Sequence, residues 1–317
     1  MRFLLLMSLL LSHPVFAQNS SSSINLGSTK STDADQPAST SLQLKNILGE
    51  KQIADPNVIT DQKLKADEGS RSLYSVKFNL GYAGPGITDL GNKDQPNPDH
   101  VVNTMQTKLS GNIGARYRID GISAVNAGTG ITAIHPLHGW DRTDVSTPYL
   151  SYDRSSRINE FQLRQTISGA YVTTPEYVKE GEVVSTYYDL DLVRQLGDSR
   201  FSLGLESQFN YFFYSHNYDE NNKSDWGGAQ TYYAFLPNLK YRVNDRLNLN
   251  TYFVQMFYNH RGVSDLSMID RRTLTQRIGI GYSFAKDVYL SPYITYFPSK
   301  ANTDTTTFNL SAVFSIL

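Results

Sequence analysis

The sequence predicts an all-β fold: a single transmembrane antiparallel up-and-down β-barrel of about twelve strands, preceded by a signal peptide and a disordered N-terminal tail. Apolar and polar residues alternate with period two from Leu73 to the end of the chain, and short turns alternate with long polar loops. No stretch after Ala17 approaches the roughly 18 consecutive apolar residues that a membrane-spanning helix needs. We therefore expect strands, not helices, to cross the membrane.

The N-terminus has the three parts of a secretory signal peptide. Arg2 supplies the positive charge, Leu4 to Leu11 form the apolar core, and the run ending at Ala17 offers a small residue for cleavage before Gln18. The apolar core is too short for a transmembrane anchor, which is the alternative interpretation. We therefore assign residues 1–17 to the signal peptide.

Residues 18–70 are predicted to form a tail. They are rich in Ser, Thr, Asp and Gln and poor in apolar residues, which is typical of disorder. Leu44, Ile47 and Leu48 have the spacing of one helical turn, but short helices are marginal alone, so an unstructured linker is favoured there. The tail either lies free in the periplasm or enters the barrel as a plug.

Residues 71–317 are predicted to form the barrel, beginning with a strand whose two faces differ. Its apolar positions are Tyr74, Val76, Phe78, Leu80 and Tyr82, and its polar positions are Ser75, Lys77, Asn79 and Gly81. The same alternation returns over residues 108–117, 160–171, 201–213 and 233–243. One face of each strand is therefore expected to contact lipid and the other the lumen.

The connections set the strand count. Short turns are predicted at Asp120-Gly121, Arg154-Ser155, Gly197-Asp198, Asn244-Asp245 and Lys286-Asp287, and long loops at 84–103, 134–144, 174–182, 216–228, 260–270 and 299–305. About eleven strands are clear, which leaves the two kinds of connection out of phase near residue 145. A strand from Val145 to Asp153 restores the phase and gives about twelve, although Pro148 weakens it.

The last strand bears on the location of the protein. Phe308, Leu310, Ala312, Phe314 and Ile316 alternate to the C-terminus, and this pattern resembles the signal read by the barrel-assembly machinery of Gram-negative bacteria. Leu317 stands where that signal usually has Phe. A soluble β-sandwich is the alternative, but strands of about ten residues favour a cell outer membrane barrel.

Composition agrees with this prediction and excludes other classes. The mean hydropathy of −0.39 is that expected when lipid-facing and lumen-facing residues alternate, and the 21 Tyr suit interfacial girdles. The chain has no Cys, so strand pairing must stabilise it without disulfides. A net charge of −1 gives no sign of nucleic-acid binding. No cofactor is expected.

Histidines in the predicted loops are the main candidates for chemistry. His135 and His138 have H-x-x-H spacing, but without accompanying ligands unbound surface histidines are favoured over a metal site. The segment from His216 to Asn221 resembles the histidine segment of outer-membrane phospholipases. Tyr218 stands where that family has its serine nucleophile, so we do not predict an enzyme.

The inward-facing polar positions suggest a transport function. The candidates for a charged lumen or constriction are Arg164, Asp189, Asp191, Glu206, Lys77, Lys108 and Arg277. Arg164, Asp189, Asp191 and Glu206 are predicted to lie on three consecutive strands, near mid-height of the barrel. They would either select small polar solutes or pair with one another and fill the barrel, since about twelve strands lie between the filled and the open size classes.

Basic residues also gather near the predicted periplasmic strand ends. They are Arg116, Arg118, Arg194, Lys240, Arg242 and Arg246. They would form a basic ring that either attracts anionic solutes or, as we favour, lies beside lipid phosphates.

We predict a narrow porin-like channel for small hydrophilic solutes. The alternative is a closed barrel that acts through its exterior loops, for example loop 216–228 with Trp226. The expected partners are outer-membrane lipid and lipopolysaccharide, the barrel-assembly machinery, and small polar solutes.

Overall fold

A computed structural model of the chain describes residues 59–98, 106–217, 228–262, 269–285 and 287–316. The signal peptide, most of the predicted tail and its suggested helix near Leu44 lie outside these residues. No helix of the described residues is long and apolar enough to span a membrane.

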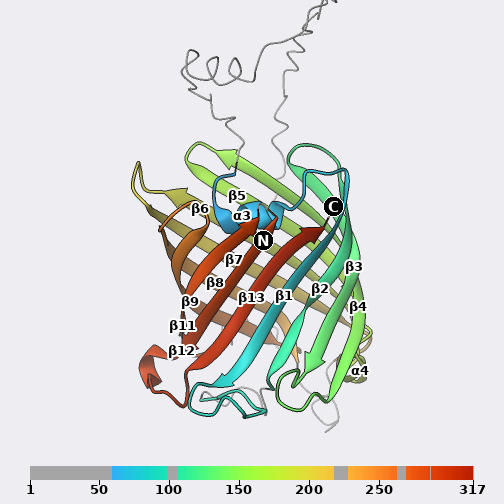
Figure 1. Cartoon of the computed structure of the whole chain (residues 1–317). Helices are drawn as coiled ribbons and strands as arrows, with labels where there is room; N and C mark the ends of the chain where they lie inside the picture. The colour runs from blue at the N-terminus through green and yellow to red at the C-terminus, as the bar shows by residue number, and fades with distance from the viewer. Residues whose placement is uncertain (1–58, 99–105, 218–227, 263–268, 286, 317) are drawn as a thin grey trace, which may run out of the picture. The chain divides into compact units, whose positions relative to one another are not determined.

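Twelve antiparallel strands form one closed ring, which confirms the predicted fold (Figure 1). Each strand pairs with its neighbours along the chain, and β1 pairs with β13 to close the ring. The strands are β1 (Tyr74–Gly86), β2 (Lys108–Arg118), β3 (Ser123–Ile134), β4 (Arg142–Ile158), β5 (Phe161–Tyr171), β6 (Glu182–Gln195), β7 (Phe201–Tyr214), β8 (Ala229–Arg242), β9 (Leu247–His260), β11 (Thr275–Ala285), β12 (Val288–Tyr296) and β13 (Thr307–Ile316). A thirteenth, the short β10 (Ile269–Arg271), pairs only with the end of β9.

Short helices complete the described structure. They are α3 (Gln62–Glu68), α4 (Pro175–Lys179) and the 3₁₀ helix η1 (Pro298–Lys300). We call the end of the barrel with the short turns and α3 the turn end, and the opposite end with α4 the loop end (Figure 1). The predicted alternation of short and long connections is confirmed.

One predicted turn is wrong. Arg154 and Ser155 do not form a turn, because β4 continues to Ile158, and both residues pair with β5, which starts at Phe161. The chain reverses instead at Asn159, which has a φ of 55°. Alternation could not place this turn, because Asn159-Glu160 and Arg154-Ser155 are both short polar pairs.

The strand predicted over residues 145–153 is confirmed and is longer, running from Arg142 to Ile158. Pro148 lies where the register between β3 and β4 shifts, between the pairs formed by Gly128 and Gly130. Thr147 precedes it with a φ of 58° and donates its N–H to the Thr173 hydroxyl at 2.7 Å, outside the strand ladder. The proline therefore sits at an irregularity that needs no ladder hydrogen bond from it.

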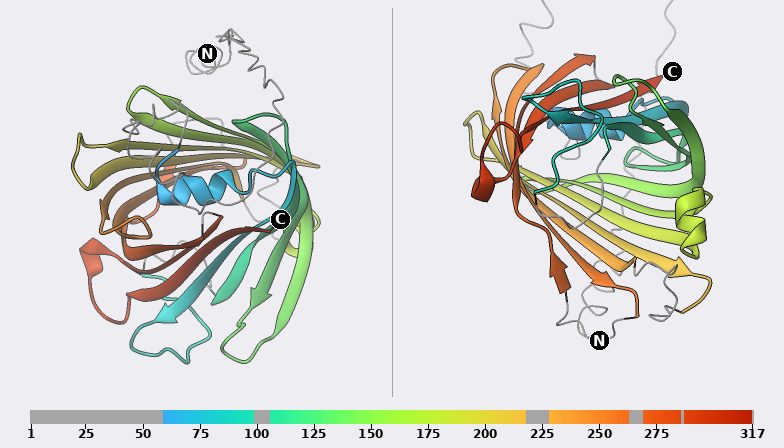
Figure 2. Two further views of the ribbon diagram at one scale, coloured as in Figure 1. Left: turned by 45° about the horizontal axis from the view of Figure 1, so that its top comes forward. Right: turned by 90° about the horizontal axis from the view of Figure 1, so that it is seen from below.

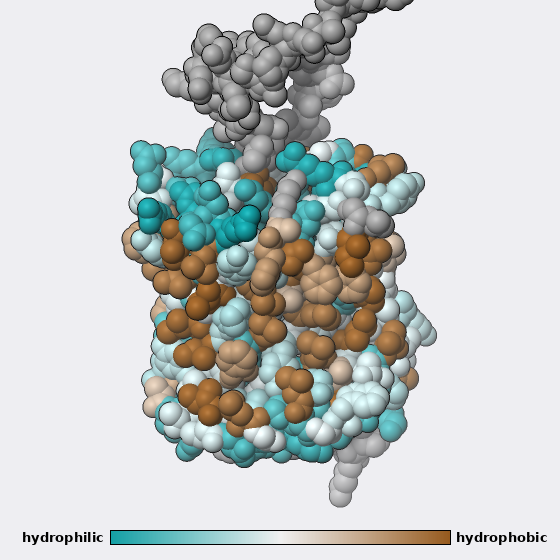
Figure 3. Space-filling model, viewed as in Figure 1, coloured by the Kyte–Doolittle hydropathy of each residue, from teal (hydrophilic) through white to brown (hydrophobic). Residues whose placement is uncertain are grey.

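Apolar side chains gather across the middle of the outer wall on the face seen in Figure 3. Large side chains point outward at alternate positions, among them Leu150 at the centre of β4, Phe235 on β8 and Ile278 on β11. Leu150 is 60% exposed without lipid, whereas its neighbour Ser151 is buried inside. Such a wall is stable only in contact with acyl chains, so the barrel is a transmembrane one.

The described end of the tail lies inside the turn end of the barrel, as both views in Figure 2 show for α3. Asp61 caps the first turn by accepting a hydrogen bond from the Leu64 N–H at 3.0 Å. Leu64 packs with Ile59 against Val193 of β6, and Ala66 packs against Tyr289 and Val313 on the other side of the helix. A seven-residue helix is marginal alone, so these wall contacts stabilise it.

Candidate functional site: the charged lumen

A row of charged side chains crosses three neighbouring strands inside the barrel. Arg164 of β5 lies directly opposite Asp191 of β6, which lies opposite Glu206 of β7. The predicted placement of these three residues on consecutive strands is therefore confirmed. The row lies nearer the turn end than the loop end, not near mid-height as predicted, since Arg164 is only three positions from the start of β5 at Phe161.

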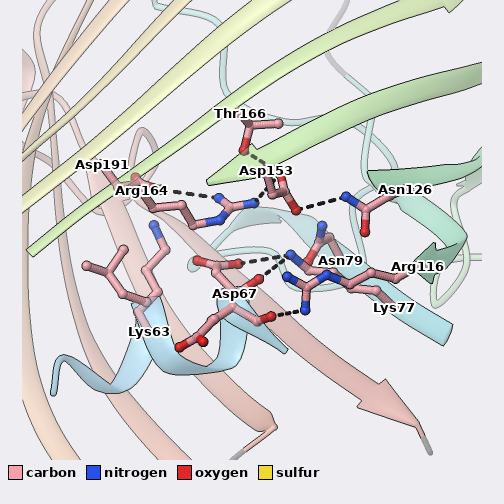
Figure 4. Close-up of polar contacts among 12 residues, drawn as sticks. Lys63, Asp67, Lys77, Asn79, Arg116, Asn126, Asp153, Arg164, Thr166 and Asp191 are labelled. Carbon is pink, nitrogen blue, oxygen red and sulfur yellow. Dashed lines mark hydrogen bonds and ion pairs between the residues drawn. The ribbon is translucent and has the colours of Figure 1, made fainter. Parts of the chain in front are cut away.

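Arg164 is held by carboxylates on both sides (Figure 4). Its guanidinium nitrogens lie 3.2 Å from Asp153 Oδ1 on β4 and 3.4 Å from Asp191 Oδ2 on β6. Asp153 also accepts hydrogen bonds from Thr166 at 2.7 Å and Asn126 at 2.9 Å. Buried charges need such pairing because isolation from water is costly.

Helix α3 extends this charged network across the lumen. Lys63 Nζ lies 2.5 Å from Glu206 Oε1. Lys77 on β1 donates to the Asp67 carbonyl oxygen at 2.6 Å, and its ammonium lies 4.0 Å from the Asp67 carboxylate. Strands β1 and β7 are six places apart in the ring of twelve. The helix is therefore tied to opposite walls of the barrel. Figure 4 shows the Lys77–Asp67 side of this attachment.

The C-terminal end of α3 is held by arginines of β2. The Glu68 carbonyl oxygen accepts hydrogen bonds from Arg116 and, at 3.3 Å, from Arg118. Arg118 also donates to the Ser70 carbonyl oxygen at 2.8 Å and pairs with the Glu68 carboxylate at 3.5 Å. Gly69 ends the helix with a φ of 72°, in the left-handed region that favours glycine. Cations at a helix C-terminus also favour its dipole.

The N-terminal end of α3 is held by β5 and β8. The Gln162 side-chain oxygen accepts hydrogen bonds from the N–H groups of Thr60 and Asp61 at 2.6 and 2.8 Å. Lys240 Nζ lies 3.0 and 3.2 Å from the two carboxylate oxygens of Asp61. Burial alone would raise the pKa of Asp61, but the Lys240 ammonium and the Leu64 N–H hold it below its ordinary value.

The remaining lumen candidates do not join this network. Asp189 lies two positions from Asp191 along β6 and has no hydrogen-bond or ion-pair partner among the described residues. Arg277 is half-buried with its guanidinium 5.5 Å from the centre of the Tyr293 ring. Lys108 begins β2 at the loop end and is exposed. Four of the seven candidates, Arg164, Asp191, Glu206 and Lys77, thus form ion pairs within the network.

Several residues of the network were not among the predicted candidates. Asp153 was recoverable from its strand, because it alternates with Leu150 and Tyr152 and so faces the lumen. Asp61, Lys63 and Asp67 lie in the predicted tail, where no strand pattern shows which way a side chain points. Their positions depend on the docking of α3, which is a tertiary event.

The expected lipid-facing basic ring is not formed as a unit. Arg116, Arg118 and Lys240 are buried and contact the α3 segment instead of lipid phosphates. Arg194 pairs with Glu160 at 2.5 Å beside the turn between β4 and β5, and both side chains are well exposed. The alternation of Arg116 and Arg118 with Ala115 and Tyr117 already places both arginines on the inner face.

The loop histidines make ordinary polar contacts. His135 Nδ1 lies 2.7 Å from Asp141 Oδ2, and His138 Nε2 lies 2.7 Å from the Tyr82 hydroxyl. Asp141 also pairs with Lys93, and its pKa is lowered mainly by the hydrogen bond with His135. His216 Nδ1 lies 3.2 Å from the Ser215 hydroxyl, and Tyr218 is outside the described residues. No group of three metal-ligating side chains gathers within the described ranges.

These features define a transmembrane β-barrel of the outer-membrane type, with an even number of strands and a polar interior. Comparison with known proteins agrees with the fold. No family model and no curated protein sequence matches the chain. The COG4313 outer membrane channel from Pseudomonas putida F1 is similar in structure, with a TM-score of 0.50 and 12% sequence identity over 79% of this chain and 98% of that one.

Two other solved structures show weaker similarity. The NanC porin aligns with a TM-score of 0.41 and 7% identity over 76% of this chain and 98% of that one. The toluene transporter TbuX from Ralstonia pickettii aligns with a TM-score of 0.37 and 10% identity over 76% of this chain and 87% of that one. At these identities the similarity to the first channel supports the barrel fold alone.

Proposed function

We propose that the protein is a narrow outer-membrane channel for small hydrophilic solutes, exported through its N-terminal signal peptide. The observation that carries this proposal is the row of acidic and basic side chains, centred on Arg164, that faces the lumen of a closed barrel with an apolar exterior. Charges are costly to bury, and a polar interior is typical of barrels that conduct water-soluble molecules. Transport, not catalysis, is the function that this interior favours.

The charged row would act as the selective part of the channel. A solute that passes this row loses hydrogen bonds with water. It can replace them with hydrogen bonds to the Arg164 guanidinium and to the flanking carboxylates of Asp153 and Asp191. Asp189 lies beside this row on the loop side and is not engaged by another described residue. It is therefore the carboxylate best placed to meet a passing cation.

We further propose that residues 59–70 act as a plug for the turn end. Support comes from their contacts with opposite walls: Lys63 with β7, and Asp67 with Lys77 on β1. These contacts are ion pairs and hydrogen bonds, which water can replace more readily than a packed apolar interface. The plug would limit conductance while docked and widen the channel when it leaves.

Single-channel recording in planar bilayers tests both parts. The full chain is expected to give small conductance steps, and deletion of residues 19–68 larger ones. D189N should lower the preference for cations over anions, whereas R164Q should raise it because the flanking carboxylates are then uncompensated. D198N, in an exposed turn, is the matched control and should leave selectivity unchanged.

Absence of conductance steps from both proteins, with folding verified by heat-modifiable gel migration, would overturn the channel proposal. Equal conductance of the full chain and the deletion variant would overturn the plug while leaving the channel.

A closed barrel that acts through its exterior loops is the second candidate function. It is favoured by the same docked helix, because α3 and its ion pairs occupy the turn end of the lumen. In liposome swelling, exclusion of every small sugar and amino acid by both the full chain and the deletion variant would support this candidate. Lipid hydrolysis lost on His216→Ala would support an enzyme instead.

A further inference from the structure

A buried carboxylate that has no partner among the described residues faces a cavity at the loop end of the barrel. Glu182 begins β6, opposite Tyr214, the last residue of β7. The next pair is Val184 with Phe213, so Val183 is an extra residue and forms a β-bulge. A bulge changes the side to which the neighbouring side chain points, and Glu182, just before it, lines the cavity together with Ser185.

Glu182 is unusual among the buried charges of this barrel. It is only 9% exposed, yet it has no hydrogen bond or ion pair with any described residue. Asp153, Asp191 and Lys240 are as buried, and each has a charged partner within 3.4 Å. An ionised carboxylate in such a place is costly unless something pairs with it.

The cavity has room for a small molecule. Its volume is about 310 Å³, within the lower range of ligand pockets. Its lining combines two carboxylates with three aromatic rings: Glu180, Glu182, Tyr177, Phe212 and Tyr214, with Val172 and Ser185 among the others. Acidic groups beside aromatic faces are the combination that attracts organic cations.

The molecule already contains one contact of this type next to the cavity. The Arg261 guanidinium lies 4.0 Å from the centre of the Tyr214 ring, which shows that this ring accepts a cation. Arg261 itself donates to the backbone carbonyl oxygens of Glu180 and His216 at 3.0 and 2.5 Å. Glu182 makes no ion pair with Arg261 or with any other described residue.

We propose that this cavity binds the ammonium or guanidinium group of a small organic cation, with Glu182 as its counter-ion and the neighbouring rings as its walls. The site goes beyond the channel function and does not require that the barrel conducts. A hard divalent ion is a poorer fit, because calcium takes six to eight oxygen ligands and magnesium six, and rings form much of this wall. The loop-end position makes it accessible from the exterior.

Titration of the full-length protein in detergent micelles tests the site. The probe is n-butylammonium, and binding is followed by the backbone amide resonances of β6. Saturable binding is expected in wild type, with affinity about tenfold weaker in E182Q, which keeps the shape and removes the charge. F212L removes one ring and should also weaken binding. E160Q, an exposed acid at the turn end, is the control and should bind as wild type.

Three results would overturn the proposal: equal binding by wild type and E182Q, tighter binding of n-butyrate than of n-butylammonium, or saturable binding of calcium alone. Because binding is measured without any current, a failure here is distinct from a failure of the channel proposal. Heat-modifiable migration establishes that each variant is folded. If E182Q does not fold, F212L still decides between the outcomes.

Discussion

The attachment of the N-terminal segment to the barrel gives a quantitative prediction for Asp61→Ala. The substitution removes three contacts of one carboxylate: two with Lys240 Nζ, at 3.0 and 3.2 Å, and one with the Leu64 N–H, at 3.0 Å. Loss of a helix N-cap costs about 1 kcal/mol. Removal of one partner from a buried ion pair costs about 3–5 kcal/mol, because the other charge is left unpaired.

The side chains of Asp61 and Lys240 are 10% and 6% exposed, so the pair counts as buried. Water can reach Lys240 once the segment moves. We therefore take the lower limit, about 3 kcal/mol, as the free energy of docking that the substitution removes. At about 1.4 kcal/mol per factor of ten, this corresponds to a roughly 100-fold rise in the undocked fraction.

Limited trypsin digestion measures that fraction, because Lys63 and Lys65 of α3 become cleavable only when the segment undocks. Where docking is fast relative to cleavage, the rate follows the undocked population, so D61A should be cut about 100 times faster. The double variant D61N/K240M removes both charges and should be cut at a rate much closer to that of wild type. Equal rates for D61A and wild type would refute the assigned anchoring role.

Acidification tests independently whether the negative charge of Asp61 stabilises docking of the segment. Asp61 has a pKa lowered below its ordinary 3.8, so its stabilisation of docking is present above about pH 4 and is lost as the pH falls further. The difference in cleavage between wild type and D61A should therefore shrink below pH 4, with pepsin replacing trypsin. A difference that stays constant down to pH 2 would contradict the ion-pair explanation.

Two further predictions concern the barrel wall. L150R places a charge on the lipid face at the centre of β4 and should lower the unfolding free energy in lipid vesicles by about 2–4 kcal/mol, measured by urea titration. L137R, in an exposed loop, should be nearly neutral, and an equal loss for both would argue against the assigned membrane belt. G111V should lower the folded, heat-modifiable fraction, because a Cβ at Gly111 would collide with the Asn79 carbonyl oxygen of β1. G121A has open space around it and serves as the control; full folding of G111V would disprove the close approach.

Period-two alternation was sufficient to predict the strands and their faces, because successive side chains of a strand point to opposite sides whatever the strand pairs with. The side chain of Asp153 is set inward by its own strand, and so is that of Lys77. The count of twelve followed from the alternation of short and long connections. The turn after Ile158 was missed because two short polar pairs compete locally, and only pairing with β5 decides between them.

Tertiary structure alone decided what the lumen contains. Lys63 and Glu206 are 143 residues apart, and Asp61 and Lys240 are 179 apart, so no local pattern connects them. The tail has too few apolar residues to predict a docked helix, and α3 is stabilised by partners on opposite walls that exist only once the ring has closed. The same holds for Glu182, whose direction depends on a bulge opposite β7. Alternation along each strand predicts where the wall lies and which residues face inward. Closure of the barrel decides which inward charges are paired and which have no partner in the part of the chain that the structure describes.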